Sequence, residues 1–391
     1  MEFYYHNPTE LTFGEGTFGR VGELTAPLGC RAMLVTGRSA MEKAGYLQRA
    51  KDLLEGAGVA VTVFNEIPPN PTLDAVLEGA ELARAERCEV MVGLGGGSAM
   101  DAAKAIAVAA SHECDMREFL LPDENGQKRL PSEATLPIVA VTSTAGTSSE
   151  LTPFAVINVP DTHAKPAMAG PNIFPRIAIE DPELTYTMPA QVTAATGVDV
   201  LCHAAEGYIS TVATPLTDHT ALKAMELVAE HLPKAVADGE NISARRGMML
   251  ANTFAGYTLA QAGGNVMHAL EHPMGGHYPD IAHGAGLAAV LVAWAEQMWD
   301  RAPQRFATVA RIFGIQDAND NSAAAKLSGV LKEFLGTVGM DVALADLGIA
   351  EDMLGTLADD ALRYMIGGVR KTPGETTRAD LMGLLQASYR G

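Results

Sequence analysis

The stretch "EVMVGLGGGSAMDAAK", residues 89–104, joins two kinds of pattern. Residues 89–95 form an apolar run that is typical of a buried strand, and the residues from Ser98 onward have the spacing of a helix. The glycine run 95–97 stands between them. Because glycine has no Cβ, such a run lets the backbone approach a ligand closely, and the N–H groups at the start of a helix attract a phosphate. The stretch therefore predicts a strand, a turn and a helix that together hold a pyrophosphate.

A purely structural interpretation of the same stretch stays open. Ser98 could cap the helix, with Asp101 three residues later completing the capping arrangement. The spacing G-x-G-x-x-S also departs from the fingerprint G-x-G-x-x-G, so a standard Rossmann domain is not expected.

A second loop favours the nucleotide interpretation. The segment "TSTAGTSSE" (142–150) lies at the end of the apolar run 137–143. Its hydroxyl groups can donate to phosphate or ribose oxygens, and they belong to Ser143, Thr144, Thr147, Ser148 and Ser149. Two such loops at the ends of two strands of one sheet predict a dinucleotide crevice.

Strands and helices alternate on both sides of these loops. Further strands are predicted at 31–37, 59–64, 154–159 and 176–181, and helices at 39–56 and 72–87. Continuous apolar strands separated by helices indicate a parallel sheet that is covered on both faces. We therefore predict a doubly wound α/β domain.

The pattern changes after residues 181–189, because Ala, Leu, Met and Glu become dominant. Helices are predicted at 190–210, 215–236, 243–263, 283–299, 303–314, 322–338 and 377–389. A chain of 391 residues is long enough for two domains. We expect an α/β nucleotide-binding domain over 1–185 and an all-helical metal-binding domain over 186–391, with the cleft between them as a ligand site.

The composition is that of a globular protein, with 48% hydrophobic and 19% charged residues. The net charge of −19 would repel polyanions, so neither nucleic acid nor an anionic membrane surface is expected as a partner. The start "MEFYYHNPTE" has no signal-peptide pattern, and no apolar run reaches the roughly 20 residues of a membrane span. The four cysteines form no C-x-x-C pair. We expect a cytoplasmic protein.

Four histidines crowd the segment "MHALEHPMGGHYPDIAHG" (267–284). His268 and His272 are four residues apart, which places them on one face of a helix, and His277 and His283 follow beyond a Gly-Gly break. The run from His268 to His272 fits H-x-x-E-H, the pattern of a zinc protease. A metal site of a different enzyme class is the alternative.

A second pair supports the alternative. Asp199 and His203, in "GVDVLCHAAEGYIS" (197–210), are also four residues apart on a predicted helix. A carboxylate and imidazoles suit Fe²⁺ or Zn²⁺. For this pair alone, a surface carboxylate and a core histidine remain the simpler interpretation.

Four motifs, "GGGSAMDAAK", "TAGTSSE", "GVDVLCHAAEGYIS" and "HALEHPMGGHYPDIAHGAGLA", occur in the order and approximate spacing of the iron-containing (group III) alcohol dehydrogenases. The opening "LTFGEGTFGRVGEL" (11–24) is similar to the N-terminal strand pair of that family. The resemblance spans nearly the whole chain. It implies a dehydroquinate synthase-like fold and a metal-dependent, NAD(P)-linked alcohol dehydrogenase or aldehyde reductase.

The resemblance also implies site residues. The metal ligands fall on Asp199, His203, His268 and His283. The cofactor contacts fall on Gly95, Gly96, Gly97, Ser98, Asp101, Ser143, Thr147 and Lys165, to which Thr144 is added as a loop donor. His272 lies near the nicotinamide and is the candidate for relaying a proton, with a packing histidine as the alternative. His277 stays a second choice of ligand or a substrate-pocket residue, because the segment before His283 is one residue longer than in many members.

On this interpretation the metal, Fe²⁺ or else Zn²⁺, polarises the oxygen of a small primary alcohol or aldehyde, and a hydride moves between its carbon and the nicotinamide. A zinc protease would leave the glycine loop and Asp199 without a role. Glycerol dehydrogenase and dehydroquinate synthase share the fold, but the segment 190–300 has few basic residues to hold a phosphate-bearing substrate. A non-catalytic metal-binding protein is the remaining alternative. The oligomeric state stays open, with a homodimer as one option.

The cofactor preference depends on "LVTGRSA" (34–40). Many NAD-preferring members have an aspartate at the end of this strand, where it holds the ribose hydroxyls and repels a 2′-phosphate. This chain has Gly37 there, followed by Arg38 and Ser39, which can donate to a phosphate. We therefore expect NADP, with NAD as the alternative; a tight turn at Gly37 is the structural interpretation.

Overall fold

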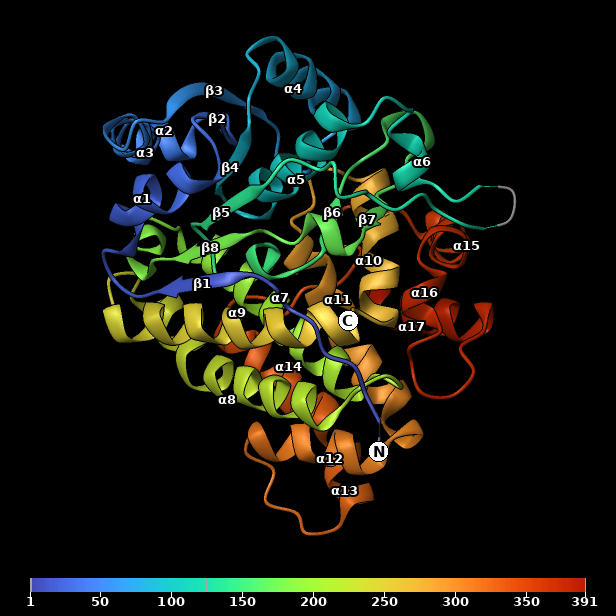
Figure 1. The fold of residues 1–391 in the computed structure, drawn as a ribbon. Coiled ribbons are helices and arrows are strands. Elements are labelled where there is room, and N and C mark those ends of the chain that lie inside the picture. Colours follow the sequence, from blue (N-terminus) through green and yellow to red (C-terminus); the bar gives the residue numbers. More distant parts are fainter. Residues whose placement is uncertain (1, 124–125, 391) are drawn as a thin grey trace. The chain divides into compact units, whose positions relative to one another are not determined.

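The protein is described by a computed structural model that covers residues 2–123 and 126–390 (Figure 1). Its internal contacts divide the chain into two units. The first, called the sheet unit, is His6–Thr187, and the second, called the helical unit, is Met188–Gly391 together with Met1–Tyr5. Among the described residues, no helix is both long and apolar enough to cross a membrane.

The sheet unit is built on six parallel strands in the order β1-β8-β5-β4-β2-β3. The strands are β1 (Glu10–Phe13), β2 (Arg31–Gly37), β3 (Ala60–Ile67), β4 (Val90–Gly95), β5 (Ile138–Thr142) and β8 (Ile177–Glu180). The strand order indicates where a ligand would be expected. The chain passes from β2 to β3 on one side and then returns to place β4 and β5 on the other side of β2. Parallel sheets bind ligands at such a reversal, beyond the carboxyl ends of the strands, which here are the ends of β2 and β4.

Helices cover both faces of this sheet. Alternate residues of β2 enter two separate cores: Ala32 and Leu34 pack with α1 (Val21–Thr25), α2 (Ala40–Lys43) and α3 (Tyr46–Gly56). Met33 and Val35 pack on the other face with α4 (Leu73–Ala85) and α5 (Gly97–Ser111). Because successive side chains of a strand point to opposite faces, this alternation requires two covered faces. The predicted doubly wound α/β domain is confirmed.

Three predicted elements of this unit differ from the structure. The helix expected at 39–56 is interrupted by Gly45, whose φ of 78° ends α2 before α3 begins. The strand expected at 154–159 is the shorter β6 (Phe154–Val156), which pairs antiparallel with β7 (Ala167–Ala169) outside the main sheet. A short helix, α6 (Arg117–Leu120), was not predicted.

The N-terminal strand pair expected over 11–24 was wrong in its second half. Only β1 is a strand, and a 3-10 turn (Thr17–Arg20) and α1 follow it. The helical turn brings Phe18, Val21 and Leu24, three residues apart, onto the same buried core. Three side chains at this spacing share one face of a helix, whereas a strand would alternate them.

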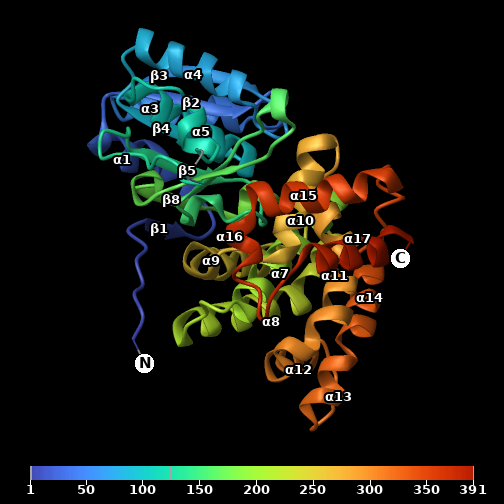
Figure 2. The ribbon, with the colours of Figure 1, turned by 90° about the vertical axis from the view of Figure 1, so that its right-hand side faces the viewer.

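The helical unit contains no strand among its described residues. Its helices are α7 (Ala190–Ile209), α8 (Pro215–Ala237), α9 (Ile242–Ala262), α10 (Val266–His277), α11 (His283–Met298), α12 (Pro303–Ile312), α13 (Asp320–Ala325), α14 (Leu327–Thr337), α15 (Leu354–Tyr364), α16 (Ile366–Val369) and α17 (Arg378–Arg390). In Figures 1 and 2, α7, α10 and α11 lie close together within this unit, and contacts join α11 to both other helices. The predicted all-helical C-terminal half is confirmed.

Three details of this unit were not predicted. The helix expected at 322–338 is divided into α13 and α14, and α15 and α16 lie in a segment that had no predicted helix. The Gly-Gly pair at 275–276 does not break α10, which continues to His277. Glycine costs a helix about 1 kcal/mol relative to alanine, but Met274 and Gly275 are buried against neighbouring helices, and such packing outweighs propensity.

Candidate metal centre and nucleotide crevice

Four side chains from three helices converge in the helical unit. Asp199 and His203 lie one turn apart on α7, His268 lies on α10, and His283 is the first residue of α11. The side chains of Asp199, His203 and His268 are 3%, 6% and 6% exposed, and that of His283 is 24% exposed. All four residues predicted as metal ligands are therefore brought together, with the fourth reaching toward the surface.

The three imidazoles point their Nε2 atoms at one oxygen. Asp199 Oδ1 is 3.5 Å from Nε2 of His203, 3.5 Å from Nε2 of His268 and 3.6 Å from Nε2 of His283. These distances are longer than ordinary hydrogen bonds. Two ligands of a tetrahedral cation with bonds of about 2.1 Å are separated by about 3.4 Å, so the spacing fits ligands that share a cation.

Unsatisfied polar atoms support the same conclusion. Asp199 Oδ1 and His268 Nε2 are buried and make no hydrogen bond within the described chain. Leaving buried polar atoms without a partner costs about 1–3 kcal/mol each. Asp199, His268 and His283 also offer ligand atoms that lie within 4.8 Å of one another. The residues present therefore fit a divalent cation.

The charges of the cluster are tightly coupled. Burial alone would raise the pKa of Asp199, but the neighbouring charges of His203, His283 and His268 lower it below its usual range. Burial opposes the protonation of His268, yet the carboxylates of Glu206 and Asp199 raise its pKa to about 10. A cation bound to Nε2 of His268 would replace that proton.

His272 and His277 take different places. The side chain of His272 is 7% exposed, and its ring lies 5.8 Å from the ring of His283 and 6.5 Å from that of His268. His272, Glu271 and His283 offer a second, overlapping set of atoms within 4.8 Å. Nε2 of His277 instead bonds to Oδ2 of Asp360 on α15 at 2.8 Å, and His277 belongs to neither set.

The two predicted loops of the sheet unit meet at the carboxyl ends of adjacent strands. β4 ends in Gly95, whose φ of 145° suits glycine, and β5 ends where the loop 142–150 begins. A Cβ built on Gly97 would lie only 2.5 Å from Cγ2 of Thr147. The second loop therefore occupies the space that a side chain at residue 97 would need.

The start of α5 is open rather than capped. Its N-cap is Gly96, with no side-chain hydrogen bond, so the capping arrangement with Ser98 as the cap is wrong. Helix N-termini with free N–H groups are suited to phosphate oxygens.

Asp101 has a different setting from that of the glycines. Its carboxylate accepts from Oγ of Ser149 at 2.5 Å and from the backbone N–H of Val156 at 2.9 Å. Lys104, one turn later on α5, is fully buried, and its Nζ donates to the backbone oxygens of Ser149, Thr152 and Phe154 at 2.6, 2.9 and 2.6 Å. Sequence reasoning missed Lys104. We call Asp101, Lys104 and Ser149 the loop clamp, because they hold the second loop onto α5.

The end of β2 is the remaining part of the predicted crevice. Gly37 has no positive φ, and a Cβ built on it would lie 3.7 Å from the backbone oxygen of Ile67, which is an ordinary contact. The tight-turn explanation of Gly37 is therefore unnecessary. Arg38 and Ser39 are exposed next to it.

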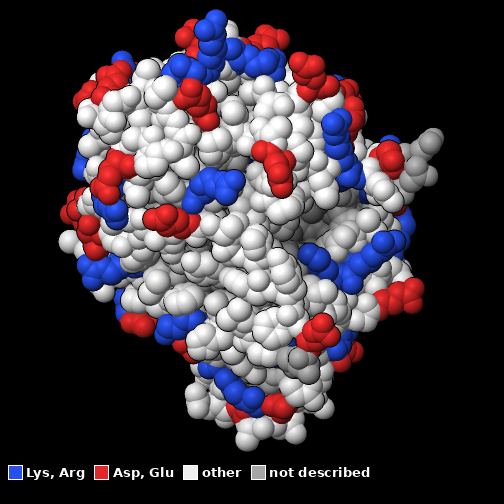
Figure 3. All heavy atoms as spheres, viewed as in Figure 1, with Lys and Arg blue, Asp and Glu red and all other residues white. Residues whose placement is uncertain are grey.

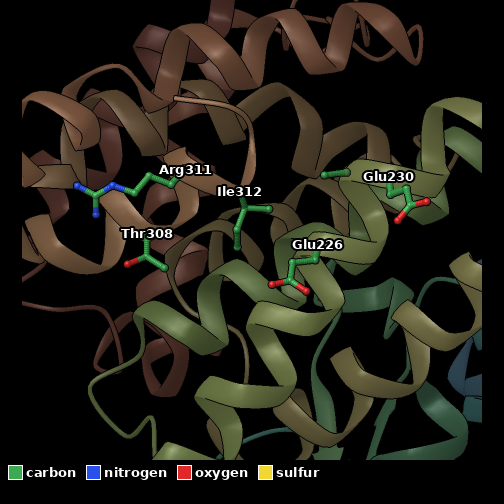
Figure 4. Close-up of a pocket in the computed structure, with 6 residues that line it drawn as sticks. Glu226, Glu230, Thr308, Arg311 and Ile312 are labelled. Carbon is green, nitrogen blue, oxygen red and sulfur yellow. The ribbon is translucent and has the colours of Figure 1, made fainter. Parts of the chain in front are cut away.

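A hollow on the helical unit contains none of the predicted site residues. It has a volume of about 590 Å³ between α8 and α12 and is lined by Glu226, Ala229, Glu230, Thr308, Arg311 and Ile312 (Figure 4). Its charges are engaged elsewhere, since Glu230 pairs with Lys234 and Arg311 pairs with Asp320. On the face shown in Figure 3, acidic and basic side chains are interspersed, and the basic ones form no continuous stripe among the described residues.

Comparisons with known proteins agree with this geometry. The family model described as "Iron-containing alcohol dehydrogenase" matches residues 8–182, and the model of the C-terminal domain of the Fe-containing alcohol dehydrogenases matches residues 193–389. Choline dehydrogenase of Bacillus subtilis is 36% identical over 357 residues, covering 91% of this chain and 88% of the relative. NAD-dependent methanol dehydrogenase of Bacillus methanolicus is 32% identical over 356 residues, covering 90% and 92%. The crystal structure of an archaeal halo-thermophilic alcohol dehydrogenase from a Red Sea brine pool is 38% identical, with a TM-score of 0.95 over 99% of both chains.

Proposed function

The chain belongs to the iron-containing alcohol dehydrogenase family, and from this premise we propose that it is a metal-dependent enzyme that transfers a hydride between a small primary alcohol or its aldehyde and a nicotinamide cofactor. The main support for this proposal is that the Nε2 atoms of three histidines lie 3.5–3.6 Å from Oδ1 of Asp199. Methanol and choline, the substrates in the names of two relatives, are both primary alcohols. The zinc-protease alternative gains no support, because both family models are those of dehydrogenases.

The residues proposed to hold the cation, Fe²⁺ or else Zn²⁺, are Asp199, His203, His268 and His283. When bound, the cation supplies Lewis-acid stabilisation that lowers the pKa of a substrate hydroxyl, and the cofactor accepts the hydride. Asp199 contributes a charge that offsets part of the cation's charge in a buried site. The partly exposed side chain of His283 marks the side from which a small substrate could approach.

We propose His272 as the residue that passes the released proton toward solvent. It lies one turn after His268 on the same face of α10, and its ring is 5.8 Å from that of the partly exposed His283. A His272→Ala variant should keep its bound metal and lose about 10²-fold in turnover, with an altered pH profile of alcohol oxidation. Metal analysis together with that pH profile checks this role; loss of the metal would instead identify His272 as a ligand or a structural support.

In the sheet unit, the proposed cofactor contacts are Gly37, Arg38 and Ser39 after β2, Gly95, Gly96, Gly97 and Ser98 at the start of α5, and Ser143, Thr144, Thr147 and Lys165. Asp101 is also proposed as a cofactor contact, although its carboxylate already accepts hydrogen bonds from Ser149 and Val156. The uncapped start of α5 supports a pyrophosphate site. We propose NADP as the preferred cofactor, because Arg38 is exposed and, within the described chain, makes no hydrogen bond or ion pair.

The test combines metal analysis with an activity panel. Protein purified without oxygen should contain one divalent cation per chain and should change the absorbance of a nicotinamide cofactor when given short primary alcohols or aldehydes. Choline in the panel tests whether a cationic alcohol is accepted. Protein that contains metal but oxidises no alcohol and reduces no aldehyde would contradict the proposed function. Light scattering of the same sample tests whether the chain forms a homodimer.

A further inference from the structure

Two of the proposed metal ligands have a buried carboxylate behind them. Nδ1 of His268 lies 2.5 Å from Oε2 of Glu206, and Nδ1 of His283 contacts Oε2 of Glu271. Both glutamates are fully buried. In each histidine, Nδ1 faces a glutamate while Nε2 faces Asp199 Oδ1.

Glu206 is itself held rigidly. Besides Nδ1 of His268, its carboxylate accepts from the backbone N–H of Asn265 at 2.8 Å and from that of Met267 at 2.5 Å. These N–H groups belong to the N-cap residue and the second residue of α10, and a negative charge is favourable at this end of a helix. The side-chain amide of Asn265 donates to the backbone oxygen of Glu206 at 2.8 Å. The carboxylate therefore has little freedom to turn away from His268.

A glycine of α11 leaves room for Glu271, and a second glycine lets α11 approach α7 closely. A Cβ built on Gly286 of α11 would lie 2.9 Å from Cγ of Glu271, so the absence of a side chain there leaves room for the glutamate. A Cβ built on Gly284 would lie 1.8 Å from the backbone oxygen of Ala195. α11 is thus seated directly on α7 at the residue after His283.

We propose that Glu206 and Glu271 are positioning residues for the metal, each accepting the Nδ1 proton of one histidine. An imidazole that donates from Nδ1 carries its lone pair on Nε2, so each carboxylate selects the tautomer that can bind a cation and fixes the direction of the ring. The negative charge of the glutamate also makes Nε2 a stronger electron-pair donor to the cation. This inference rests on the proposed metal site and adds two residues that do not themselves touch the cation.

The alternative is that Glu206 only stabilises the start of α10, and a matched pair of variants separates the two roles. Glu206→Gln removes the charge that faces His268. Asn265→Ala removes the other side-chain bond at the same helix start but leaves the carboxylate in place. Both changes should lower the melting temperature of the metal-free protein. Only Glu206→Gln should weaken metal binding.

The experiment measures the affinity of metal-free protein for Zn²⁺ by competition with a chelator. We expect about 10- to 100-fold weaker binding for Glu206→Gln and for Glu271→Gln. We expect unchanged binding for Asn265→Ala and for Glu296→Gln, an exposed glutamate on α11 that controls for the lost charge. Loading with Co²⁺ adds a second measurement, because its visible spectrum reports the geometry of the ligands. That spectrum should change in the two positioning variants alone.

Each outcome has a definite meaning. Affinity within about twofold of wild type, with an unchanged Co²⁺ spectrum, in Glu206→Gln and Glu271→Gln would overturn the positioning role while leaving the metal site standing. Equal weakening by Asn265→Ala would show that Glu206 acts only through the helix start. If Glu206→Gln does not fold, Glu271→Gln decides alone. Wild-type protein that binds neither Zn²⁺ nor Co²⁺ would remove the proposed metal site and the positioning role together.

Discussion

The proposed sites of the sheet unit and the helical unit depend on opposite kinds of residue. In the sheet unit the site depends on glycines, which have no side chain. Gly95 adopts a φ of 145°, and the side chain of Thr147 occupies the space that a Cβ on Gly97 would need. In the helical unit the site depends on side chains that are present and buried, with Asp199 and His268 left without ordinary hydrogen bonds at the atoms that face each other. The first site is therefore shaped by backbone, and the second by polar groups that are costly to bury unless a cation joins them.

This difference predicts opposite kinds of sensitivity. Removing a side chain should damage the helical site, and adding one should damage the sheet site. The largest effect is expected for His268→Ala. This change removes one proposed ligand, and it also removes the imidazole that faces the buried carboxylates of Asp199 and Glu206. Turnover should fall on the order of 10³-fold, with loss of bound metal.

His277→Ala is the matched control for that variant, since it removes a histidine from the same helix that pairs with Asp360 instead. It should keep the metal. Full metal occupancy and full activity in His268→Ala would contradict the proposed set of metal ligands. Elemental analysis and steady-state rates of the two variants make the measurement.

The second prediction tests whether the sheet unit also contains a buried charge on which its site depends. Lys104→Met should cost about 3 kcal/mol or more in the free energy of unfolding, because it removes the donor of three backbone oxygens and the positive charge near the buried carboxylate of Asp101. The loop 142–150 should become looser, and cofactor binding should weaken. Chemical denaturation and cofactor titration measure both effects.

The pH dependence sharpens this prediction. Burial lowers the pKa of Lys104 to about 8, although the charges of Asp101 and Glu150 oppose the shift. Between that pH and the ordinary pKa of an unfolded lysine near 10.4, the unfolded chain binds the extra proton. The stability contribution of this group therefore increases as pH rises through that interval and is smallest below about pH 8. Relative to Lys104→Met, wild-type protein should gain stability from pH 8 toward pH 10; a flat difference would show that Lys104 does not titrate there.

The same comparison explains what the sequence could predict. The run 31–37 coincides with β2, because residues 32–35 form a continuous apolar run, as expected of a strand buried on both faces. Asp199 with His203, and His268 with His272, could be singled out because each pair is four residues apart within one helix. His283 lies on a different helix, and only the family resemblance pointed to it. Glu206 and Lys104 were missed because their partners are 62 and 45 residues away, and no local pattern marks such contacts. The continuation of α10 past its glycines was missed because burial decides it, and local propensity does not.

A smaller effect is expected from adding one methyl group to the sheet site. Gly97→Ala would place a Cβ 2.5 Å from Cγ2 of Thr147, and relief of that contact should cost about 1–3 kcal/mol and displace the second loop. Cofactor should bind more weakly while the metal content stays unchanged. Gly56→Ala is the control, because no atom lies within 4 Å of a Cβ at that position. Equal cofactor affinity in Gly97→Ala and wild type would show that the loop contact is unimportant for the nucleotide.

The smallest effect, and the sharpest test of the backbone-shaped site, is expected at Gly37. A side chain fits there without a clash, since the nearest atom to a built Cβ is the backbone oxygen of Ile67 at 3.7 Å, so Gly37→Asp changes charge with little strain. A carboxylate beside a 2′-phosphate is repelled, whereas it can accept hydrogen bonds from the ribose hydroxyls of NAD. We expect the ratio of kcat/KM for NADPH to that for NADH to fall about tenfold or more in Gly37→Asp, equivalent to about 1.4 kcal/mol.

Arg38→Ala should lower kcat/KM for NADPH alone. Lys43 is an exposed cation a few residues later, and Lys43→Ala should leave the ratio unchanged. Wild-type protein that already prefers NADH would show that the absence of a side chain at this position does not select the cofactor, and that the interpretation of the β2 end is wrong.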